Sequence, residues 1–197
     1  MNAELLAAAQ AYCTPFYMQP ERAYHNLTHI QNMLSALETR RVLTSALALA
    51  VWGHDLIYDP QRHDNEEQSA DIFDDWLSTA STPSELRQEV RALILATRHT
   101  SPPSTRPEAL LIDADLSILG APALAFWQYE RAIRQEYGFV AWPAYRTGRT
   151  AVLQGFLSRD RIYSTPEFAE LEAGARVNLE AALARLRERD SEDQPDA

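Results

Sequence analysis

The sequence is poor in glycine and cysteine, and it contains no lysine. Its 197 residues include six glycines and one cysteine, Cys13, so an internal disulfide is excluded. We expect Cys13 to pack as a small apolar side chain in the first helix. The alternation of polar and apolar residues that is typical of β-strands is hard to find. These absences favour a helical fold without covalent cross-links.

Long apolar segments are also lacking. No apolar run reaches the roughly 18 residues that a membrane-spanning helix needs. The first residues, MNAELLAAAQAYCTPF, lack a basic stretch followed by a long apolar core, so they do not resemble a secretory signal. We therefore predict a cytoplasmic protein that does not associate with a membrane.

Acidic residues outnumber basic ones. The 28 acids and 18 arginines give a net charge of −10, which disfavours binding to nucleic acid polymers and to anionic membranes, because both need a basic surface. A small anionic substrate is not excluded, because arginines that converge in a cleft bind phosphate or carboxylate through forked contacts.

Apolar residues recur at helical spacing along most of the chain, which predicts an all-α fold. Neither an internal repeat nor an interdomain linker is evident. We predict a single domain over residues 1–189 with roughly seven to nine helices, followed by a disordered acidic tail over 190–197. The predicted helices include 27–40, an apolar and therefore central helix over 46–58, 66–77, 81–100, 123–140, 145–163 and 165–189.

Histidines and aspartates occur in three apolar settings. His29 lies on or near the apolar stripe of its helix, and His54 directly precedes Asp55 in the central apolar segment. A buried carboxylate without compensation costs several kcal/mol, so this pair must be bonded internally or must bind a cation. Asp113 and Asp115 lie in the apolar segment LLIDADLSIL. A site built from His29, His54, Asp55 and Asp115 would suit a divalent Mn, Fe, Co, Ni or Zn ion.

The segments RAYHNLTHI, WGHDLIYDP, DNEEQSA, LILATRH, LIDADLSILG, IRQEYG and NLE resemble the HD-domain superfamily of metal-dependent phosphohydrolases. The likeness covers most of the chain and is greatest to a bacterial group described as predicted metal-dependent hydrolases. It implies a helical bundle of the HD-domain type that hydrolyses a phosphoester or phosphoanhydride of a small molecule, with nucleotides as the commonest substrates.

The resemblance also implies roles for individual residues. His29, His54, Asp55 and Asp115 would hold the metal, and Asp115 is preferred to its neighbour two residues earlier because a leucine follows it. Asp55 would also orient the water that the ion activates. Glu66 is a candidate for activating that water or protonating the leaving group, although acids in a first helical turn are also favoured by the helix dipole.

Two further histidines are candidates for a second metal ion or for phosphate. His25 would share a helix face with His29 if the helix began early enough; bonding to the backbone is the equal alternative. His99 stands where two-metal members of the superfamily place additional ligands, but a cationic imidazole at a helix C-terminus explains it as well.

Three other side chains are candidates for substrate binding. Arg134 and Arg149 could contact phosphate, although ion pairs explain most arginines in this region. Tyr58 could close the pocket or simply pack. Two other functions stay open: a diiron HD-domain oxygenase, which would need additional histidines, and a metal- or nucleotide-binding module without turnover. Oligomeric state is also open, with a homodimer as one option.

Overall fold

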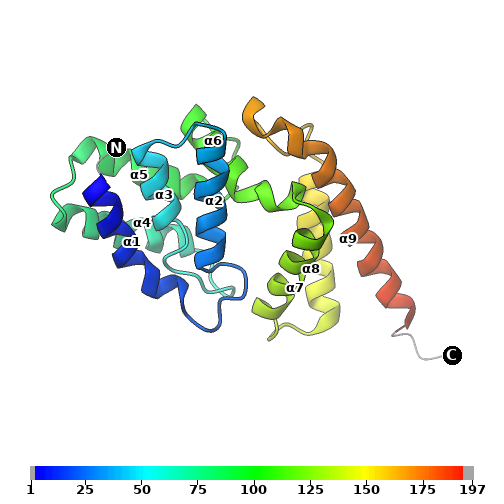
Figure 1. Cartoon of the computed structure of the whole chain (residues 1–197). Coiled ribbons are helices and arrows are strands. Elements are labelled where there is room, and N and C mark those ends of the chain that lie inside the picture. The colour runs from blue at the N-terminus through cyan, green and yellow to red at the C-terminus, as the bar shows by residue number, and fades with distance from the viewer. Residues whose placement is uncertain (1–2, 193–197) are drawn as a thin grey trace. The chain divides into compact units, whose positions relative to one another are not determined.

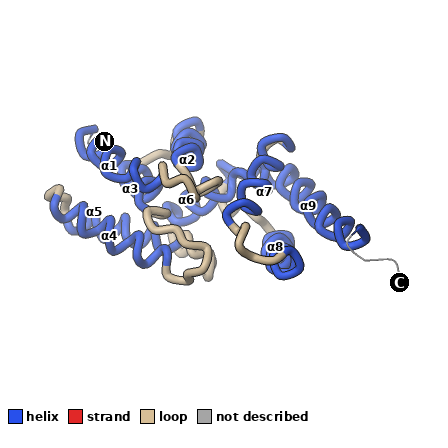
Figure 2. The backbone as a smooth tube through the Cα atoms, turned by 90° about the horizontal axis from the view of Figure 1, so that it is seen from below, coloured by secondary structure: helices blue, strands red, loops and turns tan. Residues whose placement is uncertain are grey.

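The computed structural model describes residues 3–192, with side chains through residue 188, and every regular element in that range is a helix (Figure 2). The all-α fold class is thus confirmed. The elements are α1 (Ala3–Tyr17), α2 (Leu27–Thr39), α3 (Ser45–Gly53), α4 (Asn65–Thr79), α5 (Ser84–Ala96), α6 (Arg106–Asp115), η1 (Leu116–Gly120), α7 (Ala123–Glu136), α8 (Trp142–Leu157), η2 (Pro166–Leu171) and α9 (Glu172–Glu192).

The chain divides into two compact units, Met1–Asp115 and Leu116–Ala197. The first unit holds α1 to α6, and the second holds η1 to α9 (Figure 1). The division falls inside the apolar run LLIDADLSIL, so no change of composition marks it. Helix α9 continues past residue 190, the predicted start of the tail, and residues 193–197 lie outside the described part of the chain.

No single helix within residues 3–192 is long and apolar enough to cross a bilayer; two consecutive segments, Arg106–Gly120 and Ala123–Glu136, meet the criterion only when they are taken together.

Helix α3 is the centre of the first unit. Every residue from Ala46 to Gly53 is buried, and α3 contacts each of the other five helices of the unit. The Thr44 side chain caps its N-terminus by accepting a hydrogen bond from the Leu47 amide. At its other end a Cβ on Gly53 would lie 2.4 Å from Cδ1 of Phe73, so only glycine allows α4 to pack this closely.

The central helix ends earlier than its apolar pattern predicts. Helix α3 stops at Gly53, so His54 and Asp55 lie in the turn that follows instead of within a helix over 46–58. Side chains from elsewhere in the unit bond carbonyl groups at the end of α3 and in the turn that follows. Tyr17 donates to the Trp52 carbonyl, and Arg22 donates to the carbonyls of Asp55 and Leu56. A helix end whose carbonyls are satisfied in this way is stable without another turn.

The second unit packs η1 against α9. Asn178 of α9 donates from its amide nitrogen to the carbonyls of Leu119 and Ala121. The Tyr163 hydroxyl donates to the Leu116 carbonyl, and both tyrosine and asparagine are buried. These bonds satisfy the polar groups of η1 where it is covered.

Candidate metal centre

Three side chains of the first unit place possible ligand atoms together. One ligand atom each from His29, His54 and Asp55 lies within 4.8 Å of the other two. His29 sits in the first turn of α2, whose N-terminus is fixed by Asn26 accepting from the Thr28 amide. The two histidines meet through their Nε2 atoms, 3.3 Å apart, and Nε2 of His54 is 3.0 Å from Oδ2 of Asp55.

Asp115, the last residue of α6, approaches the same histidines. Its Oδ1 is 3.2 Å from Nε2 of His29 and 4.0 Å from Nε2 of His54. Its other oxygen, Oδ2, is 3.1 Å from Nε2 of His99. We call His29, His54, Asp55 and Asp115 the His/Asp cluster. The four residues come from two helix ends, the start of α2 and the end of α6, and from the turn after α3.

The tautomer of His54 is set by a backbone carbonyl. Nδ1 of His54 lies 2.9 Å from the Val51 carbonyl, which can only accept, so Nδ1 carries a proton and donates it there. Nε2 then has its lone pair free when the ring is neutral. A hydrogen bond from the far ring nitrogen to a backbone carbonyl holds a metal-binding imidazole in the orientation that directs Nε2 at the ion.

The electrostatics of the cluster come from two carboxylates facing imidazoles. Burial alone would lower the pKa of His54, but the charges of Asp55 and Asp115 and the hydrogen bond to Asp55 raise it to about 9. Burial alone would raise the pKa of Asp55, yet the neighbouring His54 holds it below its usual range. The pKa of Asp115 is likewise lowered against burial, by its hydrogen bonds to His29 and His99. Both carboxylates are therefore ionised and favour a positive partner.

The spacing of the ligand atoms suits a single ion. Ligands held about 2.1 Å from a metal lie about 3.0 Å apart when they are adjacent in an octahedron and about 4.2 Å apart when opposite. The distances of 3.0, 3.2 and 3.3 Å match adjacent positions. Those of 3.9 Å, from His29 to Asp55, and 4.0 Å, from His54 to Asp115, fall between the two values. Two imidazoles and two carboxylates form a donor set for a divalent transition metal.

His25 and Tyr58 lie beside the cluster. Helix α2 begins at Leu27, so His25 precedes it and does not share a helix face with His29 as a continuous helix would require. Its ring stacks on Tyr58 with centroids 3.9 Å apart, and lies 5.9 Å from the ring of His29. Tyr58 therefore packs against a candidate ligand, and its contact with substrate stays a prediction.

His99 lies three residues beyond the end of α5 instead of at its C-terminus. Its φ of 55° is unusual for a residue with a side chain, though histidine adopts this region more readily than most. The ring is bonded to Asp115 through Nε2, and its Nδ1 is buried without a hydrogen-bond partner in the described part of the chain. His99 thus holds the outer oxygen of a candidate ligand.

The two glutamates that follow the turn are in the first turn of α4. Glu67 forms an ion pair with Arg98. The side chain of Glu66 makes no hydrogen bond or ion pair with any residue that the structure describes, and its catalytic role stays a prediction. His63, the fifth histidine, is exposed in the loop before α4.

The two arginines predicted to bind phosphate belong to the second unit. Arg134 donates to the carbonyls of Tyr137 and Val140, and Arg149 is buried in contact with Glu130 and the Tyr129 hydroxyl. Their side chains have structural bonds of their own, and a role in substrate binding stays a prediction.

Two residues that support the cluster were not predicted. Arg22, 6% exposed, bonds the backbone of the turn after His54, and Ser69 of α4 bonds both the amide and the carbonyl of Ile57. In the sequence, Arg22 is indicated only by its place at the start of the segment RAYHNLTHI. Ser69 lies in the segment DNEEQSA, but its supporting role could not be predicted because its partners are backbone groups.

Comparisons of the chain with protein-family models, with curated proteins and with solved structures gave no match. The HD-domain resemblance therefore stays a prediction from sequence segments, and the geometry of the cluster carries the functional argument.

Proposed function

We propose that the protein is a metal-dependent phosphohydrolase that acts on a small phosphorylated molecule. The observation that carries the proposal is the His/Asp cluster: two ionised carboxylates, 16% and 18% exposed, face two buried imidazoles whose Nε2 atoms are 3.3 Å apart. One divalent cation would neutralise both carboxylates while leaving both rings uncharged. The chemistry of the donor set fits Mn, Fe, Co, Ni or Zn.

His29, His54, Asp55 and Asp115 would hold the ion, which when bound lowers the pKa of a coordinated water and polarises a phosphoryl oxygen. Asp55 directs Oδ2 toward His54, and its other oxygen would hold the attacking water and orient it toward phosphorus. His99 keeps Asp115 turned toward His29 by donating from Nε2 to Oδ2. His25 would donate a hydrogen bond to a phosphate oxygen. A nucleotide is the substrate class that the sequence resemblance suggests.

Metal analysis followed by a phosphatase screen tests the proposal. Protein stripped with a chelator is reloaded with each of the five metals, and phosphate release is measured from nucleotides and sugar phosphates. We expect one ion per chain and phosphate release by the wild type. His54→Ala and Asp55→Asn should lose both, whereas His63→Ala, which removes an exposed histidine, should retain both.

The same measurements separate the alternatives. A wild type that binds metal but releases no phosphate from any substrate would support a binding module. Two ions per chain with oxygen consumption would support the diiron oxygenase, with His99 and His25 as the additional ligands. A wild type that binds none of the metals would refute the hydrolase, the oxygenase and a metal-binding module.

A further inference from the structure

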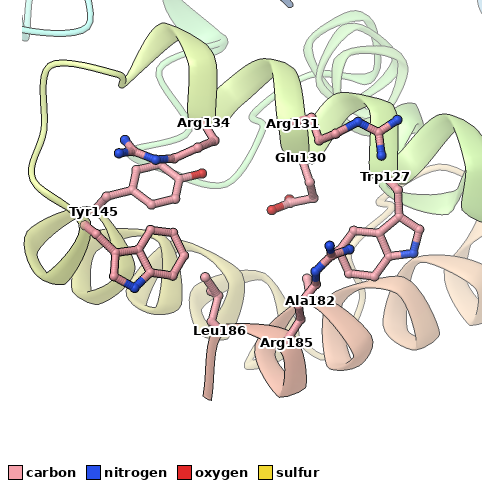
Figure 3. A pocket seen from close by; sticks show the side chains of 9 residues that line it. Trp127, Glu130, Arg131, Arg134, Tyr145, Ala182, Arg185 and Leu186 are labelled. Atoms are coloured by element: carbon pink, nitrogen blue, oxygen red, sulfur yellow. The ribbon is translucent and has the colours of Figure 1, made fainter. Parts of the chain in front are cut away.

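The second unit contains a hollow that the proposed function does not use. Helices α7, α8 and α9 surround it, and its volume is about 160 Å³. In Figure 3, Trp127 and Arg185 lie on one side and Arg134 and Tyr145 on the other, with Glu130 between them. We call it the aromatic hollow, and the side chains that define it are Trp127, Arg131, Arg134, Trp142, Tyr145 and Arg185.

The aromatic hollow is positively charged although the chain as a whole is acidic. Three arginines line it, and the single carboxylate among its walls, Glu130, is already neutralised by Arg149 from behind. The side chain of Arg131 forms no hydrogen bond or ion pair with any residue in the described range. The guanidinium of Arg185 lies over the ring of Trp127, 5.0 Å from its centroid. Both arginines are exposed, so their N–H groups are available to an anion.

The opposite wall is rigid and largely aromatic. Arg134, fixed by two backbone carbonyls of the turn after α7, lies 4.6 Å from the ring centroid of Tyr145 and 5.9 Å from that of Trp142. The two rings are 5.9 Å apart and 30° from parallel. Burial raises the pKa of Tyr145 to about 12, so its hydroxyl stays protonated at neutral pH. Flat apolar faces therefore adjoin hydrogen-bond donors.

The size of the hollow limits what it can hold. A cavity of about 150 Å³ accommodates one benzene molecule, so the hollow takes a single six-membered ring. A quaternary ammonium would suit aromatic walls in general, but the three arginines repel a cation, and two of them, Arg134 and Arg185, already lie over a face of a ring.

We propose that the aromatic hollow binds a small organic anion built on one aromatic ring. The ring enters between Trp127 and Tyr145, and the phosphate, phosphonate or carboxylate group stays at the mouth, bonded by Arg131 and Arg185. The site is separate in its residues from the His/Asp cluster, and its occupation requires no metal ion.

Titration with phenylphosphonate tests this inference, because its carbon–phosphorus bond is not open to phosphoester hydrolysis. The full chain is kept metal-free with a chelator, so that failure of the proposed function does not affect the result. Calorimetry and tryptophan fluorescence should show saturable binding with Kd below about 1 mM. Inorganic phosphate and benzyl alcohol, which carry the charge and the ring separately, should each bind at least about tenfold more weakly.

Variants locate the site. Arg131→Gln and Arg185→Gln remove exposed side chains and should fold normally, and each should weaken binding about tenfold, as expected for loss of one hydrogen bond to a charged group. Arg161→Gln, another exposed arginine of the same unit, should bind like the wild type. Equal affinity for inorganic phosphate, tighter binding of phenyltrimethylammonium, or unchanged binding in the Arg131→Gln, Arg185→Gln double variant would overturn the inference.

Discussion

The two units bury charged side chains in different ways. In the second unit, Arg149 is 8% exposed and contacts Glu130 and Tyr129. Burial alone would lower the pKa of Arg149, but Tyr129 and Glu130 hold it above its usual value. The cation and the carboxylate compensate each other permanently, so this pair needs nothing from solution.

In the first unit, Asp55 and Asp115 face imidazoles whose charge depends on protonation. No arginine bonds either carboxylate within the described part of the chain. The charge of the His/Asp cluster is balanced only by protons or by a cation, whereas Arg149 and Glu130 balance each other with charges that their side chains always carry. The difference shows that a buried charge does not by itself indicate a binding site. A buried charge that only a proton or a metal ion can balance does indicate one.

The largest expected effect on stability comes from breaking the Arg149–Glu130 ion pair. Glu130→Ala leaves the buried guanidinium of Arg149 without its counter-ion, and we expect a loss of about 3–5 kcal/mol in the free energy of unfolding. Replacing both partners, with Glu130→Leu and Arg149→Met, should restore most of that stability. Chemical denaturation measures all three proteins, and a double variant as unstable as the single one would show that the pair does more than neutralise itself.

Binding of a metal ion at the His/Asp cluster should instead stabilise the protein. A divalent metal at about a hundred times its Kd should raise the free energy of unfolding by about 2.7 kcal/mol, because the ion binds only the folded state. Thermal unfolding with and without metal measures this increase. Asp115→Asn should abolish the increase without a comparable loss in the metal-free protein; a metal response that persists in this variant would remove Asp115 from the site.

A residue that only holds a ligand in place should contribute less to metal affinity than the ligands themselves. His99→Asn is compatible with the φ of 55° but shortens the side chain that holds Oδ2 of Asp115. We expect metal affinity to fall about 10- to 100-fold at unchanged stoichiometry, as for loss of an outer partner of a metal ligand. Metal titration measures both quantities. A fall from two ions to one would instead make His99 a ligand.

The smallest expected effect on stability comes from breaking the partly exposed ion pair between Arg87 and Asp74. Arg87 donates two hydrogen bonds to Asp74, and these lower the pKa of the Asp74 carboxyl in the folded state. The resulting stability is present above the unfolded pKa of about 3.9 and is lost as the pH falls through the lower folded value. Asp74→Asn should cost up to about 1 kcal/mol at pH 7 and almost nothing near pH 2. Urea denaturation at both pH values tests this; an equal cost at the two would exclude the carboxylate charge as its source.

Helix positions were largely predictable because they depend on local periodicity. Residues 27–40 were predicted as one helix and α2 spans Leu27–Thr39. The end of α3 was not predictable, because Tyr17 and Arg22 lie more than 30 positions earlier. Tyr17 bonds a carbonyl of the last turn of α3, and Arg22 bonds a carbonyl of the turn that follows. The predicted arrangement of His54 and Asp55 on a continuous helix was therefore wrong, although both side chains still meet His29.

The sequence alone determined the helical class, the acidic charge and which imidazoles and carboxylates lie in apolar surroundings. Only the tertiary structure decided that four side chains meet, those of His29, His54, Asp55 and Asp115. It also decided that Val51 fixes the tautomer of His54 and that Glu130 neutralises Arg149. Hydrophobic periodicity acts over a few residues and leaves a local pattern. Convergence and charge compensation depend on distances between segments far apart in the chain, and packing sets those distances.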